Sequence, residues 1–171
     1  PISHERQEAV LRKQIDDLEM AIQSARYEQD GGRYTVKQIE KTRKTLQTRL
    51  EKLNQKEKKD QVVTFEELGV DHLYVDEAHS YKNAFLYTKM RNVAGIAQNE
   101  AQKSADMFNK CQYLDEITGG KGITFATGTT VSNSMTALYV MPRYLQNSKL
   151  QNMGLGLFDS WASTFGETVP A

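Results

Sequence analysis

The sequence predicts an α/β fold, in which a short parallel sheet with flanking helices carries an antiparallel coiled-coil helical hairpin. Three observations predict it: a two-part apolar repeat within residues 1–61, two short apolar segments that each run into a polar turn, and a stretch of helical composition between those segments. Residues 1–61 hold 14 Lys+Arg and 11 Asp+Glu, whereas residues 62–171 hold 8 and 11, and nine of the 11 glycines. We therefore expect two domains, a hairpin at 1–61 and an α/β region at 62–171.

Apolar residues of the first region recur in steps of three and four, which is the seam of a coiled coil. The run Gln29-Asp30-Gly31-Gly32 favours a turn, because paired glycines weaken a helix. Thr35 and Gln38 have the spacing of a capping box and predict that the second helix begins there. A loop this short makes the two helices antiparallel. The seam residues are Leu11, Ile15, Leu18, Ile22 and Ala25 on the first helix, and Val36, Ile39, Leu46, Leu50 and Leu53 on the second, with Arg43 at one seam position.

The second helix of the hairpin is rich in cations. Residues 35–59 carry nine Lys+Arg against three Asp+Glu. Clustered cations favour contact with DNA phosphates or an acidic partner. The alternative is that this helix face only contacts water, as charge runs on helices usually do. Its positive charge would then be partly neutralised by Asp16, Asp17 and Glu19 of the first helix. The whole chain, with a formal net charge of +0, argues for neither partner.

The second region contains the candidate catalytic and ligand-binding residues. The short apolar run at 72–75 reads as a buried parallel strand, and it ends in Asp76-Glu77-Ala78-His79. The carboxyl end of such a strand is where α/β sheets place ligand groups. Two adjacent carboxylates there suit phosphoryl transfer: Asp76 would hold Mg²⁺ through water, and Glu77 would orient and deprotonate the attacking water. The alternative for this four-residue motif is a solvated acidic turn.

A second polar turn follows a second strand. Residues 123–126 form another short apolar run, which leads into Thr127-Gly128-Thr129-Thr130-Val131-Ser132-Asn133, and residues 99–118 between the two strands have helical composition. A strand, a crossover helix and a parallel strand place both polar turns at the same edge of the sheet. We therefore expect His79 to lie near the hydroxyls of Thr127 and Thr129. Gly119 to Gly122 is expected to be a loop before the second strand.

Further local signals are weaker. Thr64 can cap a short helix at 65–68 that stops at Gly69, and residues 134–141 predict a helix capped by Asn133 and ended or kinked by Pro142. Cys111, the single cysteine, excludes an internal disulfide and is expected to be a small buried hydrophobe. Three aromatic residues and Ala162 share a helical face that favours packing: Phe158, Trp161 and Phe165.

The sequences VDEAHSYKN and FATGTTVSN resemble motifs II and III of superfamily 2 helicase-like ATPases in the Swi/Snf-like branch. Thr130 stands where that branch has proline. Together with LYVMPRYLQ, the run is similar to the large helicase–adenine DNA methylase polypeptides of bacterial mobile elements and phages. The resemblance covers roughly residues 62–165 and implies a partial RecA-like ATPase lobe.

This resemblance implies ATP and Mg²⁺ as cofactors of the parent protein, duplex DNA as its partner and ATP-driven movement on DNA as its activity. Asp76 would be the Mg²⁺ residue and Glu77 the catalytic base. Coupling of nucleotide state to DNA movement would fall to His79, Thr127, Gly128 and Thr129. Possible nucleic-acid contacts are Lys82 and Asn83, which match the family's Lys-Asn, and Lys89 and Arg91, for which a plain surface loop is the alternative.

Part of the ATPase machinery is not expected in this chain. No G-x-x-x-x-G-K-[ST] motif occurs, and the chain begins at Pro1. We expect the P-loop segment to precede it and the second ATPase lobe to follow it in a longer cytoplasmic polypeptide of bacterial or phage origin. The isolated chain should then neither hold ATP and Mg²⁺ nor hydrolyse ATP, and an unpaired strand edge at 123–126 should favour a homodimer. The rival hypothesis is a coiled-coil interaction or scaffold module that recruits a protein partner or a fused methylase.

Overall fold

The computed structural model describes residues 1–27, 32–55, 63–90, 100–129 and 135–167. The chain divides into two compact units, Pro1–Leu68 and Gly69–Ala171, which are described separately below. Its described residues are mostly helical, with five α-helices, one short 3-10 helix and two strands. Among the helices of this described part, none is both long and apolar enough to cross a membrane.

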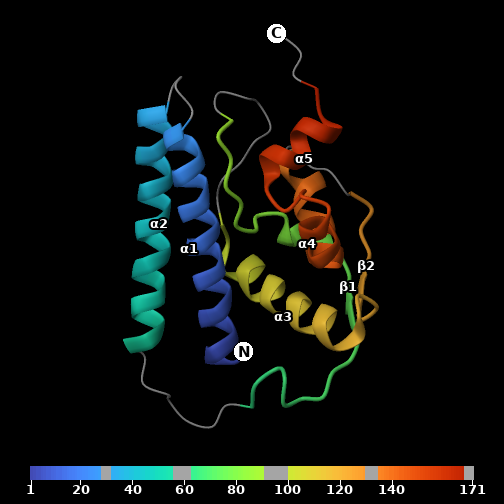
Figure 1. Ribbon diagram of the computed structural model, residues 1–171. Coiled ribbons are helices and arrows are strands. Elements are labelled where there is room, and N and C mark those ends of the chain that lie inside the picture. Colours follow the sequence, from blue (N-terminus) through green and yellow to red (C-terminus); the bar gives the residue numbers. More distant parts are fainter. Residues whose placement is uncertain (28–31, 56–62, 91–99, 130–134, 168–171) are drawn as a thin grey trace. The chain divides into compact units, whose positions relative to one another are not determined.

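The first unit is built on two helices of equal length, α1 (His4–Tyr27) and α2 (Gly32–Gln55), which lie side by side in Figure 1. Two ion pairs fix their relative direction: Arg43 contacts Glu19 at 3.1 Å, and Arg26 contacts Glu40 at 3.5 Å. From Glu19 to Arg26 the chain of α1 runs forward, while their partners, Arg43 and then Glu40, run backward along α2. The two helices are therefore antiparallel. The prediction of a helical hairpin is confirmed.

The apolar seam forms the core of this hairpin. Burial of such a continuous apolar stripe is the main source of stability for a helix pair in water. Arg43, which interrupts the seam, is half-buried and reaches Glu19, so its charge is neutralised within the hairpin. The buried seam residues are Ile15, Leu18, Ile22 and Ala25 of α1 and Ile39 and Leu46 of α2, while Leu11, Val36, Leu50 and Leu53 are half-buried.

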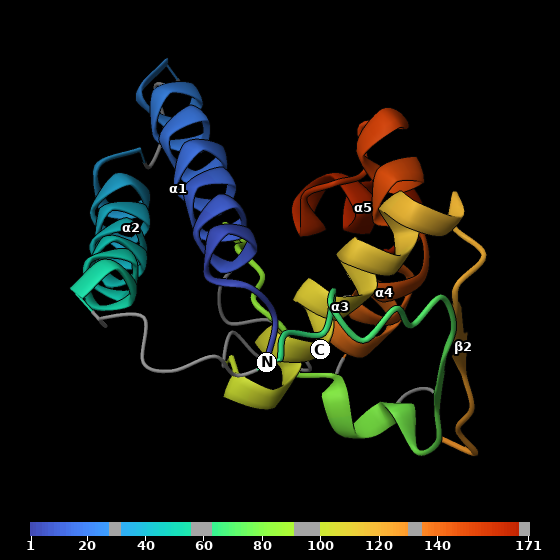
Figure 2. The same cartoon turned by 90° about the horizontal axis from the view of Figure 1, so that it is seen from below.

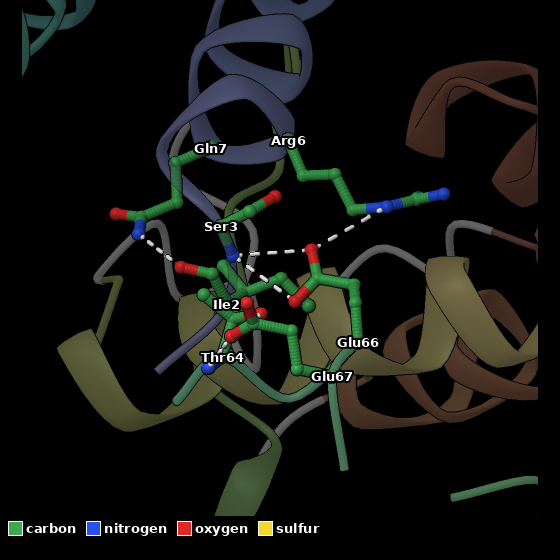
Figure 3. Close-up of polar contacts among 7 residues, drawn as sticks. All are labelled: Ile2, Ser3, Arg6, Gln7, Thr64, Glu66 and Glu67. Atoms are coloured by element: carbon green, nitrogen blue, oxygen red, sulfur yellow. Dashed lines mark hydrogen bonds and ion pairs between the residues drawn. The ribbon is translucent and has the colours of Figure 1, made fainter. Parts of the chain in front are cut away.

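A network of polar contacts links the start of α1 to residues 64–67 (Figure 3). The backbone N–H of Ser3 donates to both carboxylate oxygens of Glu66, at 3.1 and 3.2 Å, and the Arg6 guanidinium lies 3.6 Å from the same carboxylate. The N–H of Phe65 donates to the carbonyl of Pro1 at 2.8 Å. Burial alone would raise the pKa of Glu66, but these bonds and the charge of Arg6 outweigh burial and hold the pKa below 4.5.

The second unit is a β-α-β arrangement followed by two helices. Strand β1 (Leu73–Val75) leads through the 3-10 helix η1 (Ala78–Tyr81) to α3 (Gln102–Thr118), β2 (Ile123–Phe125), α4 (Thr136–Asn152) and α5 (Phe158–Phe165). The two strands pair in parallel, with Leu73 opposite Ile123 and Val75 opposite Phe125. The predicted strand, crossover helix and parallel strand are confirmed, and so is the loop at 119–122. The described sheet has two strands only, so it is smaller than a complete α/β sheet.

Helices α3, α4 and α5 lie on one side of this sheet in both views (Figures 1 and 2). The burial pattern of the strands agrees, because Val75 is buried whereas Tyr74 is 75% exposed. Tyr144 of α4 packs against Phe125 of β2 and Phe108 of α3, with ring centroids 5.4 and 6.0 Å apart. Cys111 is fully buried in this core, as expected, and burial raises the pKa of its thiol to about 12.

Three local predictions are wrong in detail. Helix α2 already begins at Gly32, three residues before the expected cap at Thr35. Residues 65–69 form a turn rather than a helix. The Glu67 carboxylate accepts from the N–H and hydroxyl of Thr64 as in a capping box, but Gly69, at a φ of +66°, leads the chain away before a helix is established. Helix α4 continues past Pro142 to Asn152, and its non-helical backbone lies at Gln146 instead.

Candidate functional site

The site is built at the carboxyl end of β1, where Asp76 and Glu77 follow the buried Val75. Glu77 has a left-handed backbone, with φ 51° and ψ 45°, and is the one non-glycine residue of the described chain with a positive φ. Such a conformation costs a residue with a Cβ roughly 1 kcal/mol or more, and strained backbone of this kind clusters at functional sites. It turns the chain sharply, so that the Glu77 N–H donates to the Asp76 carboxylate at 2.8 Å and η1 begins at the next residue.

Backbone bonds extend the strand pairing into this turn. The N–H of Ala126 donates to the carbonyl of Val75 at 2.8 Å, and the N–H of Ala78 donates to the carbonyl of Ala126 at 3.0 Å. These two bonds hold the loop after β1 against the loop after β2. The left-handed backbone of Glu77 is therefore supported on both sides by hydrogen bonds of its neighbours.

His79 and Thr127 meet across the two loops. The Nδ1 atom of His79 lies 3.1 Å from Oγ1 of Thr127 and 3.0 Å from Oε2 of Glu77. An ionised carboxylate only accepts hydrogen bonds, so we assign a proton to Nδ1, which His79 shares between Glu77 and Thr127. The expected approach of His79 to the hydroxyl of Thr127 is found in the structure.

The hydroxyl of Thr127 can donate a hydrogen bond to a further group. Its oxygen accepts from His79 and from the backbone N–H of Thr129, at 3.1 and 3.2 Å, and these two bonds occupy both lone pairs. The hydroxyl proton is then available to a third group. Thr129 itself contributes its backbone N–H rather than its exposed side chain, so the structure joins only one of the two predicted hydroxyls to His79.

The two carboxylates face solvent. Asp76 is exposed, and the side chain of Glu77 is 64% exposed. Among the described residues no three His, Cys, Asp or Glu side chains are grouped closely enough to hold a metal ion by themselves. Mg²⁺ bound together with substrate phosphates needs only one or two protein carboxylates, because phosphates and water supply the other oxygens. The Asp76 carboxylate, with one recorded hydrogen bond to Oδ1, fits that requirement.

The other predicted site residues lie along the chain that leaves η1. The N–H of Lys82 donates to the carbonyl of His79 at 3.2 Å, and the carbonyl of Asn83 accepts from the N–H of Ala101 at 2.9 Å. Asn83 is exposed, and Lys82 is half-buried. Gly128 is exposed, and a side chain there would meet no atom within 4 Å. Arg91 lies outside the described residues, as do Thr130 to Asn133.

We call residues 82–90 the strap. The sequence did not indicate which residues hold this segment in place. Arg143 of α4 donates to the carbonyl of Phe85, and its guanidinium lies 4.9 Å from the centre of the Phe108 ring. Asp159, in the first turn of α5, accepts from the hydroxyl of Thr88 and, at 2.8 Å, from the N–H of Lys89.

Tyr144 anchors the chain just before the strap. Its hydroxyl donates to the carbonyl of Tyr81 at 2.8 Å and lies 3.1 Å from the carbonyl of Ser104. Local sequence gives no signal for such partners, since 63 positions separate Tyr144 from Tyr81. The carboxyl edge of parallel strands, where Asp76, Glu77, His79 and Thr127 lie, is the edge at which open α/β sheets bind their ligands.

The comparison with known families identifies the family of the chain. A family model described as a probable helicase domain matches residues 1–169, and the chain therefore belongs to this family of helicase domains. The chain is also similar to "Defense against restriction protein B" of Escherichia phage P1, with 32% identity over 117 residues. That match covers 66% of this chain but only 5% of the phage protein, so the chain spans a small part of its relative. No solved structure matches the chain.

The expectation of a helicase-like protein with phage relatives is thus confirmed at the level of the family and of one phage protein.

Proposed function

We propose that this chain is part of an ATP-dependent helicase or translocase that acts on duplex DNA, in the Swi/Snf-like branch of superfamily 2. Its second unit would supply half of a RecA-like ATPase lobe, and its first unit a coiled-coil arm. The observation that carries the proposal is the turn after β1, where adjacent carboxylates follow a parallel strand and His79 contacts Thr127 of the next loop. Membership of the helicase-domain family supports the same activity.

Each residue of the turn has a separate task in this proposal. When bound, Mg²⁺ would neutralise charge on the phosphates, and Asp76 would hold it through water. Glu77 would orient the attacking water and take its proton, since its side chain is 64% exposed to solvent while Oε2 lies 3.0 Å from Nδ1 of His79. The Nδ1 proton of His79 holds Glu77 and Thr127 together, so a shift of either loop would be felt by the other.

The loop after β2 and the strap would carry that shift onward. Thr127 keeps a hydroxyl proton for a phosphate or a neighbouring group, and the open backbone at Gly128 lets such a group approach. The strap leads from this site to Lys89, whose N–H is fixed by Asp159. Lys82, Asn83, Lys89 and Arg91 would contact the DNA. The P-loop and the second lobe would come from other parts of the same polypeptide, so ATP turnover belongs to the longer protein.

The test is Glu77→Gln in the longer polypeptide that contains this chain. The change preserves shape but removes the base, so we expect DNA-stimulated ATP turnover to fall roughly 10²- to 10⁴-fold. ATP and duplex binding should stay within about threefold of wild type, since the amide still accepts hydrogen bonds. Glu116→Gln is the matched control, because Glu116 is exposed near the end of α3 that precedes β2. Near-normal turnover of Glu77→Gln would show that Glu77 is not the base.

A further inference from the structure

The outer face of α2 carries a row of lysines, which we call the lysine strip: Lys37, Lys41, Lys44 and Lys52. All four are exposed. At 3.6 residues per turn they fall within an arc of about 80°, and from first to last they span about 22 Å along the helix axis. The strip is therefore one continuous surface of a single helix.

The cross-helix ion pairs of the hairpin leave this strip unneutralised. Two acids of the hairpin are paired with arginines across the helices, Glu19 with Arg43 and Glu40 with Arg26. In the described part of the chain no ion pair is recorded for any of the four lysines, and Glu51 is the one exposed acid of α2 that borders them. Of the three acids of α1 expected to neutralise this charge, Glu19 pairs with Arg43 rather than with a lysine of the strip.

The strip also opposes the stability of the helix that carries it. Lys37 and Lys41 are four residues apart, and Lys41 and Lys44 are three apart, so their side chains are neighbours on the helix surface. Like charges at these spacings repel each other and destabilise the helix. A face that needed only to be solvated would be more stable with alternating charges.

The residues between the lysines indicate the kind of partner. The exposed positions there are polar, including Thr45 and Thr48, whose hydroxyls donate to the carbonyls of Lys41 and Lys44 at 3.1 and 3.0 Å. The strip offers no large apolar anchor, whereas the centre of a protein–protein interface is usually apolar or aromatic and poor in lysine. Lysine binds phosphates as a flexible point charge and needs no exact geometry. A polyanion with closely spaced charges is the partner that this surface fits.

We propose that the lysine strip of α2 is a phosphate-backbone contact for duplex DNA, separate from the site after β1. The choice of duplex DNA as the polyanion rests on the proposed function. The strip is long enough to follow about six base pairs, at 3.4 Å of helix axis per base pair. Contacts of this kind supply affinity and orientation but no sequence preference.

The experiment measures binding of the full 171-residue chain to a fluorescent 20-base-pair duplex over a range of salt concentrations, without nucleotide. The test variant is K37Q/K41Q/K44Q, and the control K13Q/K121Q/K149Q removes the same charge from exposed positions outside the strip. We expect the test variant to bind at least about tenfold more weakly and its salt slope to fall by up to about three. The control should stay within about threefold of wild type.

Glutamine has nearly the helix propensity of lysine, so the variant should keep its helical circular dichroism. If K37Q/K41Q/K44Q loses its helical circular dichroism, K37R/K41R/K44R replaces it as the informative variant. This variant keeps the charge, so its helix content and its duplex binding should both equal those of wild type. Equal losses in the test and control variants would overturn the proposal. So would equal competition by polyglutamate of the same total charge, which would assign the strip to an acidic protein.

The result is independent of the ATPase test. Duplex binding lost in K37Q/K41Q/K44Q, with normal turnover in Glu77→Gln, would leave the strip proposal standing and reject the proposed base. Normal duplex binding in K37Q/K41Q/K44Q, with turnover lost in Glu77→Gln, would reject the strip and keep the ATPase.

Discussion

The two units of the chain are stabilised in different ways. In the hairpin, a periodic apolar seam lies within two helices that follow each other directly, and residues such as Leu18 and Leu46 are almost fully buried. In the second unit, polar contacts join segments that are far apart in sequence, with 63 positions between Tyr81 and Tyr144 and 71 between Thr88 and Asp159. The hairpin can therefore form from local sequence, whereas the strap depends on helices that come much later in the chain.

This difference bears on function. The residues that flank the candidate site after β1 are fixed by α4 and α5, so a change in either helix would reach the strap. The hairpin has its own core and its own charged face. We therefore expect each unit to keep its fold when the core of the other is disrupted.

The largest expected effect is that of Leu46→Asp. Leu46 is 1% exposed in the hairpin seam, and an unpaired carboxylate there should cost about 3–5 kcal/mol and melt the hairpin. Amide hydrogen exchange of α1 and α2 peptides measures this loss. Trp161, the single tryptophan, lies on α5 and reports on the second unit, so its fluorescence should stay unchanged.

Thr45→Asp is the control for this substitution, because Thr45 is exposed on the same helix and should tolerate the charge. A change in Trp161 fluorescence that accompanies melting of the hairpin in Leu46→Asp would contradict the independence of the two units.

A smaller effect is expected for Tyr144→Phe. Tyr144 is fully buried, and loss of its hydroxyl would leave the carbonyl of Tyr81 without this donor, at a cost of about 1–3 kcal/mol to the second unit. Denaturant unfolding followed by Trp161 fluorescence measures it. Tyr74→Phe, at a 75% exposed position, should have no effect. Equal stability of the two variants would show that the Tyr144 hydroxyl does not stabilise this unit.

The part of the fold that follows from local periodicity could be predicted from sequence. The hairpin seam, the β-α-β order and the approach of His79 to Thr127 all depend on patterns within a few residues or on the rule that parallel strands share an edge. The local pattern places the start of α2 at Thr35, because Thr35 and Gln38 have the spacing of a capping box, whereas the helix already begins at Gly32.

The parts that sequence did not predict depend on contacts across the fold. The left-handed backbone of Glu77 is compatible with the bonds that Ala78 and Ala126 make, and glutamate by itself does not indicate it. The partners of the strap, Arg143 and Asp159, could not be found because nothing local marks an arginine or an aspartate as the partner of a distant backbone group. Long-range polar contacts of this kind require the folded arrangement.

The smallest effect concerns Glu66 at the base of the hairpin, and it depends on pH. Because hydrogen bonds from Ser3 and the charge of Arg6 hold the pKa of Glu66 below its unfolded value of 4.5, its contribution is fully present above about pH 4.5. That contribution is lost as the pH falls through the lower folded pKa. Glu66→Gln should therefore make the hairpin less stable by no more than about 1 kcal/mol at pH 7, and the difference from wild type should vanish in acid. Hydrogen exchange of α1 peptides between pH 7 and pH 3 measures it, and Glu51→Gln, at an exposed position of α2, should match wild type throughout. A difference between Glu66→Gln and wild type that persists unchanged into acid would mean that packing of this side chain, and not its charge, stabilises the base of the hairpin.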